Sequence, residues 1–141
     1  MTRSLIPMSF LLACTIAIAG SARAQAPSAV SDPLSALQGA WTEKGQENCS
    51  KPLFTVSVAS DRKAFRVTSV DGGVSNATVL HTEPNRIYLF YEGEKRRTPQ
   101  GDLLLWWLIL DTPESYQMRR IDWPESARTK GTWVKCGSVK P

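Results

Sequence analysis

Apolar and polar residues alternate along short stretches of the chain. In residues 53–59, Phe54, Val56 and Val58 alternate with polar residues, and residues 64–70 alternate again. A period of two sends successive side chains to opposite faces of a β-strand, which is typical of a sheet with one buried face. Further β-prone runs surround Trp41 and occupy residues 74–81, 86–92, 103–110, 115–121 and 132–136.

Turn residues separate these runs at intervals of roughly ten residues. The clearest turn is Asp71-Gly72-Gly73, because glycine adopts the positive φ angles that tight hairpin turns need. About eight such strands, without a long helical pattern, predict an all-β fold. We expect an antiparallel meander closed into a small barrel, with a β-sandwich as the alternative.

The first 24 residues have the pattern of a cleavable secretory signal peptide. Arg3 supplies a positive charge, residues 5–20 are mainly apolar or small, and Ala22 and Ala24 stand where signal peptidase reads small side chains. The stretch is too short for a typical membrane-spanning helix. We therefore expect cleavage near Ala24, a periplasmic or secreted protein, and no membrane span in the mature chain.

The chain has three cysteines, and one of them lies in the predicted signal peptide. Residues 11–14 resemble a bacterial lipobox, so lipidation of Cys14 is an alternative to cleavage near Ala24. Cys49 and Cys136 remain in the exported part, and an even pair in an oxidising compartment predicts a disulfide. In the chain-entropy model, closing a loop of this length contributes about 4 to 5 kcal/mol.

Composition predicts two segments after the signal peptide. Residues 25–36 are rich in alanine, serine and proline, which predicts a flexible leader ahead of a single barrel domain in residues 37–141. The formal net charge of the whole chain is +4, but Arg3 and Arg23 belong to the predicted signal peptide. The remaining charge is nearly balanced, so nothing indicates a nucleic-acid partner.

Gly39 and Trp41 form a Gly-x-Trp motif at the start of the first predicted strand. The motif and the number of strands resemble those of lipocalin-like (calycin) proteins. In that family the tryptophan closes the narrow end of the barrel, and an arginine from a late strand lies across its ring in a cation–π contact. The resemblance implies that Arg119 or Arg120 has this structural role here.

A second resemblance rests on a longer run, Leu37-x-Gly39-x-Trp41 followed by Gly45 and Cys49. This run is similar to the bacterial periplasmic metalloprotease inhibitors of the Inh type. In that family a flexible N-terminal segment enters the protease cleft, where the terminal amine meets the catalytic zinc. The resemblance implies that residues 25–35 form such an arm.

Eight consecutive apolar residues, Leu-Leu-Leu-Trp-Trp-Leu-Ile-Leu, occupy positions 103–110. On a strand they place large side chains on both faces, so the face away from the core is either covered or binds something. We expect cover by the leader, a loop or a partner subunit, or else an apolar ligand cavity or interface. The predicted ligand-binding residues are Trp106, Trp107, Tyr88, Phe90 and Arg120.

Adjacent arginines on a strand point to opposite faces. If Tyr116 and Met118 point into the barrel, Arg120 does so as well, and Arg119 points outward. A buried arginine needs an aromatic face or a carboxylate partner. Arg120 is therefore predicted either to stack on a tryptophan or to anchor an anionic head group.

Residues suited to catalysis or metal binding are scarce. His81 is the only histidine, and the chain has neither a Cys-x-x-Cys cluster nor a nucleophile-elbow motif. We predict no metal site, no cofactor and no enzymatic activity. We expect an exported binding module, lipocalin-like, for a small apolar or amphipathic molecule, and the alternative is a module for a protein partner, such as a protease inhibitor.

Overall fold

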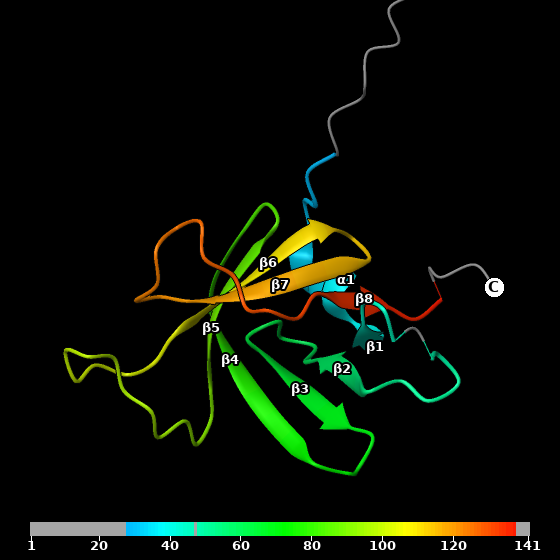
Figure 1. The fold of residues 1–141 in the computed structure, drawn as a ribbon, viewed down its shortest axis with the longest axis horizontal. Helices are drawn as coiled ribbons and strands as arrows, with labels where there is room; N and C mark the ends of the chain where they lie inside the picture. The colour runs from blue at the N-terminus through cyan, green and yellow to red at the C-terminus, as the bar shows by residue number, and fades with distance from the viewer. Residues whose placement is uncertain (1–27, 47, 138–141) are drawn as a thin grey trace, which may run out of the picture.

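A computed structural model describes residues 28–46 and 48–137 (Figure 1). The predicted signal peptide, including Cys14, and residues 25–27 of the predicted leader lie outside the described residues. In the described part of the chain, eight antiparallel strands follow one another around a closed barrel. They are β1 (Gly39–Glu43), β2 (Phe54–Val58), β3 (Ala64–Ser69), β4 (Val74–Glu83), β5 (Arg86–Tyr91), β6 (Trp106–Thr112), β7 (Ser115–Arg120) and β8 (Trp133–Lys135). The predicted all-β meander and its closure into a barrel are confirmed, and the sandwich alternative is wrong.

The register between strands decides which side chains enter the barrel. Leu89 on β5 pairs with Trp106 on β6, and Leu108 pairs with Met118 on β7, so these residues share the inner face. Arg120 pairs with Trp106 and therefore shares this face, as the alternation predicted. The core that these strands enclose includes Trp41, Val56, Phe65, Ala77, Ile87, Leu89, Leu104, Leu108, Leu110 and Tyr116.

The long apolar run enters its strand later than expected. β6 begins at Trp106, whereas Leu103 makes only an isolated bridge with Arg97. Leu104 is fully buried although it lies outside the named strands. The strand prediction for residues 103–105 is therefore wrong, because an apolar run does not by itself distinguish a strand from a loop that folds onto the core.

The segment before β1 differs from the expected flexible leader. Residues Pro33–Leu37 form a short helix, α1, and the Asp32 carboxylate caps it by accepting a hydrogen bond from the Ser35 N–H at 3.1 Å. Val30 and Leu34 are buried in the barrel core. The predicted flexibility does not hold for residues 30–36, because Val30 and Leu34 anchor this segment to the barrel although most of its other residues are polar or small.

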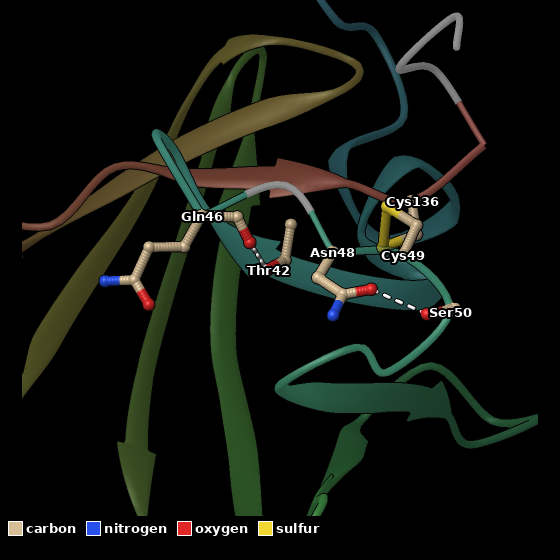
Figure 2. The surroundings of a disulfide bond; sticks show 6 residues. All are labelled: Thr42, Gln46, Asn48, Cys49, Ser50 and Cys136. Carbon is tan, nitrogen blue, oxygen red and sulfur yellow. Dashed lines mark hydrogen bonds between the residues drawn. A yellow bond between two sulfur atoms is a disulfide. The ribbon is translucent and has the colours of Figure 1, made fainter.

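A disulfide joins the loop after β1 to the residue that follows β8, as Figure 2 shows. The Cα atoms of Cys49 and Cys136 are 5.3 Å apart, and the Cys136 N–H donates to the Ala40 carbonyl at 2.8 Å. The predicted bridge is confirmed. It reinforces the barrel at the place where its first and last strands meet.

The two ends of the barrel are built from different elements. We call the end covered by α1 the helix end; there, the Val30 carbonyl accepts a hydrogen bond from Asn85 in the β4–β5 turn at 3.0 Å. We call the opposite end, formed by loops 92–105 and 121–132, the loop end. Figure 1 shows both loops on the side of the barrel away from α1.

Candidate functional site

The helix end is closed by Trp41, which is fully buried. Its Nε1–H donates to the Leu37 carbonyl at 2.8 Å. Lys135 Nζ lies 5.7 Å from the centroid of the indole ring and also donates to the Ala36 carbonyl at 2.8 Å. Trp41 and Lys135 are thus each hydrogen-bonded to a carbonyl of α1 and also contact each other.

Gly39 is required by this closure. Its φ angle is +128°, and a Cβ at this position would lie 3.0 Å from Lys135 Cε. A side chain would therefore be strained by the backbone and would displace the lysine. The Gly-x-Trp motif has a structural role, which the resemblance implied, but its cation differs from the expected one. The expectation that Arg119 or Arg120 stacks on Trp41 is wrong, because Lys135 on β8 is the direct neighbour of Trp41 in the sheet.

The loop end is covered by a pair of tryptophans. Trp106 and Trp123 meet edge to face with ring centroids 6.3 Å apart. Arg96 Cζ lies 5.8 Å from the centroid of the Trp106 ring, and Arg120 Cζ lies 5.5 Å from that of Trp123. Arg120 also donates to both carboxylate oxygens of Asp122, at 3.0 and 2.7 Å. Arg120 therefore does stack on a tryptophan, but on Trp123.

Trp106 has an unused hydrogen-bond donor at this end. Its side chain is buried to about the same extent as the core residues, yet Nε1 finds no hydrogen-bond partner among the described residues. A buried N–H without an acceptor costs about 1 to 3 kcal/mol, so such groups are rare and call for an explanation. A ligand that carries an acceptor would satisfy it.

A pocket of about 340 Å³ at the loop end is lined by Arg96 but by neither tryptophan. Tyr91, the last residue of β5, forms part of its lining, and its hydroxyl donates to Met118 Sδ at 3.9 Å. Burial raises the pKa of Tyr91 to about 12. The phenol is therefore a neutral donor at ordinary pH, next to Ser75, Glu92, Gly93, Glu94 and Arg96, which complete the lining.

Glu94 and Arg96 form the charged wall of this pocket. The Glu94 carboxylate accepts hydrogen bonds from Arg96 Nε at 2.8 Å and from the Arg96 backbone N–H at 2.9 Å. These bonds, chiefly those from the side chain, lower the pKa of Glu94 to about 2. Arg96 thus connects the carboxylate on one side with the Trp106 ring on the other.

Two further pockets lie elsewhere on the barrel. One of about 460 Å³ runs along β2 and β3 and is lined by Ser57, Val58, Ala59, Ala64, Phe65, Arg66, Thr68 and Asn76. Another of about 240 Å³ lies near Ser35 and Arg62 at the helix end. The loop-end pocket differs from both in being lined by residues of shifted pKa, and one of them, Arg96, also lies over the Trp106 ring.

The five predicted ligand-binding residues do not form one cavity. Trp106 and Arg120 face inward at the loop end, whereas Tyr88 and Trp107 stack on the outer face with ring centroids 4.8 Å apart. Phe90 pairs with Thr78, between the inward-facing Leu89 and Tyr91. None of the five lines any of the three pockets described above.

Arg119 lies on the outer face opposite Trp107. It is only 6% exposed and pairs with Glu125, with Nη2 and Oε2 2.9 Å apart. Loop 121–132 therefore covers part of the outer face of β6 and β7. This agrees with the expectation that a loop covers the second apolar face of this strand.

Three residues of the loop end were not predicted as site residues: Tyr91, Arg96 and Trp123. Tyr91 was predictable, because it continues the alternation of Ile87 and Leu89 along β5. Arg96 and Trp123 lie in loops, where no periodicity shows which side chain will turn toward the barrel.

Within residues 28–46 and 48–137, no group of three or more His, Cys, Asp or Glu side chains is placed to hold a metal ion. The described part of the chain also has no helix of the length and apolarity needed to span a membrane. The chain matches no protein-family model, and no curated protein or solved structure is significantly similar to it.

Proposed function

We propose that this protein is an exported, non-enzymatic binding module that holds a small amphipathic molecule at the loop end of its barrel. The observation that carries the proposal is the buried Trp106 Nε1, which has no acceptor among the described residues. The ligand supplies that acceptor and places its apolar part against the indole.

The packed interior of the barrel favours a ligand site at one end of the barrel over a site at its centre. Leu89, which pairs with Trp106, and Leu108, the next inward-facing residue of β6, are each at most 1% exposed. Because these side chains pack against one another, a ligand in the middle of the barrel would have to displace core residues, at a cost of several kcal/mol. The pocket beside Arg96 needs no such displacement.

The donors at the loop end indicate what the ligand carries. The Trp106 N–H is a donor that a carbonyl, sulfonate or carboxylate oxygen can use, and the Tyr91 O–H can turn to such an oxygen from its long 3.9 Å contact with Met118 Sδ. Arg96 is 67% exposed, so its guanidinium has room to turn from Glu94 toward a ligand. A flat or aliphatic group would then cover the exposed edge of the two tryptophans.

A fluorescence titration with 1-anilinonaphthalene-8-sulfonate tests the proposal, because this probe joins an aromatic body to a sulfonate. We expect its emission to rise on the wild-type protein. Trp106→Phe keeps an apolar ring and removes the donor, so we expect about tenfold weaker binding, which corresponds to one lost hydrogen bond to a charged group. Arg96→Gln should also weaken binding.

Arg66→Gln is the matched control, since Arg66 lines the larger pocket on β2 and β3. We expect it to bind the probe like the wild type. Weaker binding by Arg66→Gln with unchanged binding by Trp106→Phe would move the site to that pocket and refute the proposal. So would a flat titration together with native mass spectra that contain no co-purifying molecule.

The alternative function, a protein-binding module such as a protease inhibitor, is distinguished by a deletion. Because Val30 and Leu34 belong to the core, only residues 25–29 can be removed without disturbing it. An inhibitor of a zinc endopeptidase would lose its activity with this deletion. A carrier that uses the loop end would bind the probe as before.

A further inference from the structure

Two arginines on the outer face of the barrel converge on one carboxylate. Arg86 Nη2 lies 3.1 Å from Glu125 Oε1, and Arg119 Nη2 lies 2.9 Å from Glu125 Oε2. Arg86 comes from the start of β5 and Arg119 from β7, whereas Glu125 comes from loop 121–132. The sheet thus supplies both cations, and a loop supplies the anion between them.

The two partners of this contact differ sharply in exposure. The Arg119 side chain is 7% exposed, whereas that of Glu125 is 65% exposed. Arg119 Nη1 donates to the Trp123 carbonyl at 3.1 Å, but Nε has no hydrogen-bond partner among the described residues. A buried guanidinium needs a carboxylate, and here an exposed loop residue provides it.

An aromatic platform lies beside the two arginines. Tyr88 and Trp107 stack, and Arg86 Cζ lies 5.9 Å from the centroid of the Trp107 ring. In the sheet register, Tyr88, Trp107 and Arg119 are direct neighbours across β5, β6 and β7. Both aromatic side chains are half-buried, so they still present ring surface to solvent.

We infer that this face binds an acidic segment of a partner protein, whose carboxylate replaces that of Glu125 between Arg86 and Arg119. Apolar side chains next to that carboxylate would then lie on Tyr88 and Trp107, since aromatic and arginine side chains are the usual anchors of protein interfaces. The inference does not depend on the loop-end pocket, because Arg86, Arg119, Tyr88 and Trp107 are not among the residues that line it.

The shape of the face favours a protein segment over a small anion. None of the three pockets described above includes Arg86, Arg119, Tyr88 or Trp107. An open surface leaves a small ion hydrated, whereas an extended segment can bury area on both sides of its carboxylate. Glu125 itself shows the geometry in which such a carboxylate would be held.

Removing the Glu125 carboxylate by mutation tests the inference. We would measure the fluorescence anisotropy of a labelled heptapeptide, GSLELSG, and of its control, GSLQLSG, on the wild type and on Glu125→Gln. Removing an intramolecular competitor raises the fraction of binding-competent protein. We expect Glu125→Gln to bind the glutamate peptide about fivefold more tightly than the wild type, and Glu125→Ala to do the same. The glutamine peptide should not distinguish these proteins.

A second variant identifies the arginines as the source of the effect. Adding Arg86→Gln to Glu125→Gln should remove the preference for the glutamate peptide, whereas adding Arg66→Gln, on another part of the barrel, should leave it intact. The inference is refuted if Glu125→Gln binds both peptides equally, or if the gain survives Arg86→Gln. Concentration-dependent self-association of Glu125→Gln in sedimentation velocity, without peptide binding, would assign the face to a second copy of the chain and refute it as well.

Discussion

Each end of the barrel has a buried tryptophan with a cationic side chain over its ring, but the two indoles differ in how their N–H groups are used. At the helix end, Trp41 Nε1 donates to the Leu37 carbonyl at 2.8 Å, and Lys135 is itself bonded to Ala36. At the loop end, Trp106 Nε1 has no partner among the described residues. The first indole has its acceptor within the chain, and the second has none among the described residues.

The difference follows from what builds each end. A helix leaves its last carbonyls without partners inside the helix, so α1 brings acceptors to Trp41 and Lys135. Loops 92–105 and 121–132 instead bring side chains, and Arg96, Arg120 and Asp122 pair mainly with residues close to them in the sequence. Similar tryptophans therefore have different roles: closure at the helix end and, as we propose, ligand binding at the loop end.

The largest expected effect concerns the disulfide that joins the loop after β1 to the residue after β8. Replacing Cys49 and Cys136 by alanine should lower the free energy of unfolding by about 4 to 5 kcal/mol in the chain-entropy model. Urea denaturation of the oxidised wild type and the double variant would measure it. An unchanged midpoint would show that the helix end does not depend on the bridge.

The next largest effect is expected for Trp41→Ala. Trp41 is fully buried and contacts Tyr116 edge to face at 4.8 Å, so its removal leaves a cavity beneath α1. We expect a loss of about 3 to 5 kcal/mol. Thermal and urea unfolding would measure it, and a loss below about 1 kcal/mol would contradict the assignment of Trp41 as the closure of the barrel.

A matched pair of variants sharpens the comparison between the two ends. Trp41→Phe leaves the Leu37 carbonyl without its donor, whereas Trp106→Phe removes an N–H that has no acceptor among the described residues. Both changes remove a similar volume. We expect Trp41→Phe to be more destabilising by about 1 to 3 kcal/mol, which is the cost of a buried unpaired polar group. Equal losses in urea denaturation would contradict the difference that we draw between the indoles.

The smallest effect is the response of the two ends to acid. Hydrogen bonds, first from the Ser35 side chain and also from Arg62, lower the pKa of Asp32 from its ordinary 3.8 to about 2. The hydrogen bonds from Arg96 lower the pKa of Glu94 from 4.5 to about 2. Because the pKa is lower in the folded state, each carboxylate stabilises the folded protein when the pH is above the ordinary pKa of the group. This contribution is lost as the pH falls toward 2.

Carboxyl carbon chemical shifts, followed by NMR from pH 6 to pH 1, would measure both titrations. We expect both midpoints near 2, and the Glu94 midpoint should return toward 4.5 in Arg96→Gln while that of Asp32 stays in place. A Glu94 midpoint that does not move in this variant would contradict the Glu94–Arg96 pairing. The Asp32 side chain is 48% exposed and that of Glu94 is 8% exposed, so we expect solvent screening to leave the smaller change in stability at Asp32.

The sequence predicted the strands well because the evidence for a strand is local. Alternation at Phe54, Val56 and Val58, or glycines at 72 and 73, can be recognised without knowing the rest of the fold. The exceptions are segments whose structure depends on distant residues. Leu104 and Leu34 lie outside the strands but are buried because their side chains pack against the barrel core. Local sequence patterns do not predict this long-range packing.

The site was less predictable than the fold. Arg120 was correctly placed on the inner face, because it follows the alternation of Tyr116 and Met118 along β7, and the register shows that Trp106 shares this face. Tyr88 and Trp107 were grouped with them by their aromatic character, although they lie on the opposite face of the same strands. A list of large aromatic residues does not distinguish inside from outside until the register of each strand is known.

By itself, the sequence determined the strand order, the cysteine pair and the glycine that the first tryptophan needs, because each depends on periodicity, on an even cysteine count or on the geometry of one residue. Only the tertiary structure decided which cation meets which tryptophan. Lys135, and not Arg119 or Arg120, reaches Trp41 because closure of the barrel makes β8 the neighbour of β1. Contacts across that closure join residues almost a hundred positions apart, and no local pattern determines them.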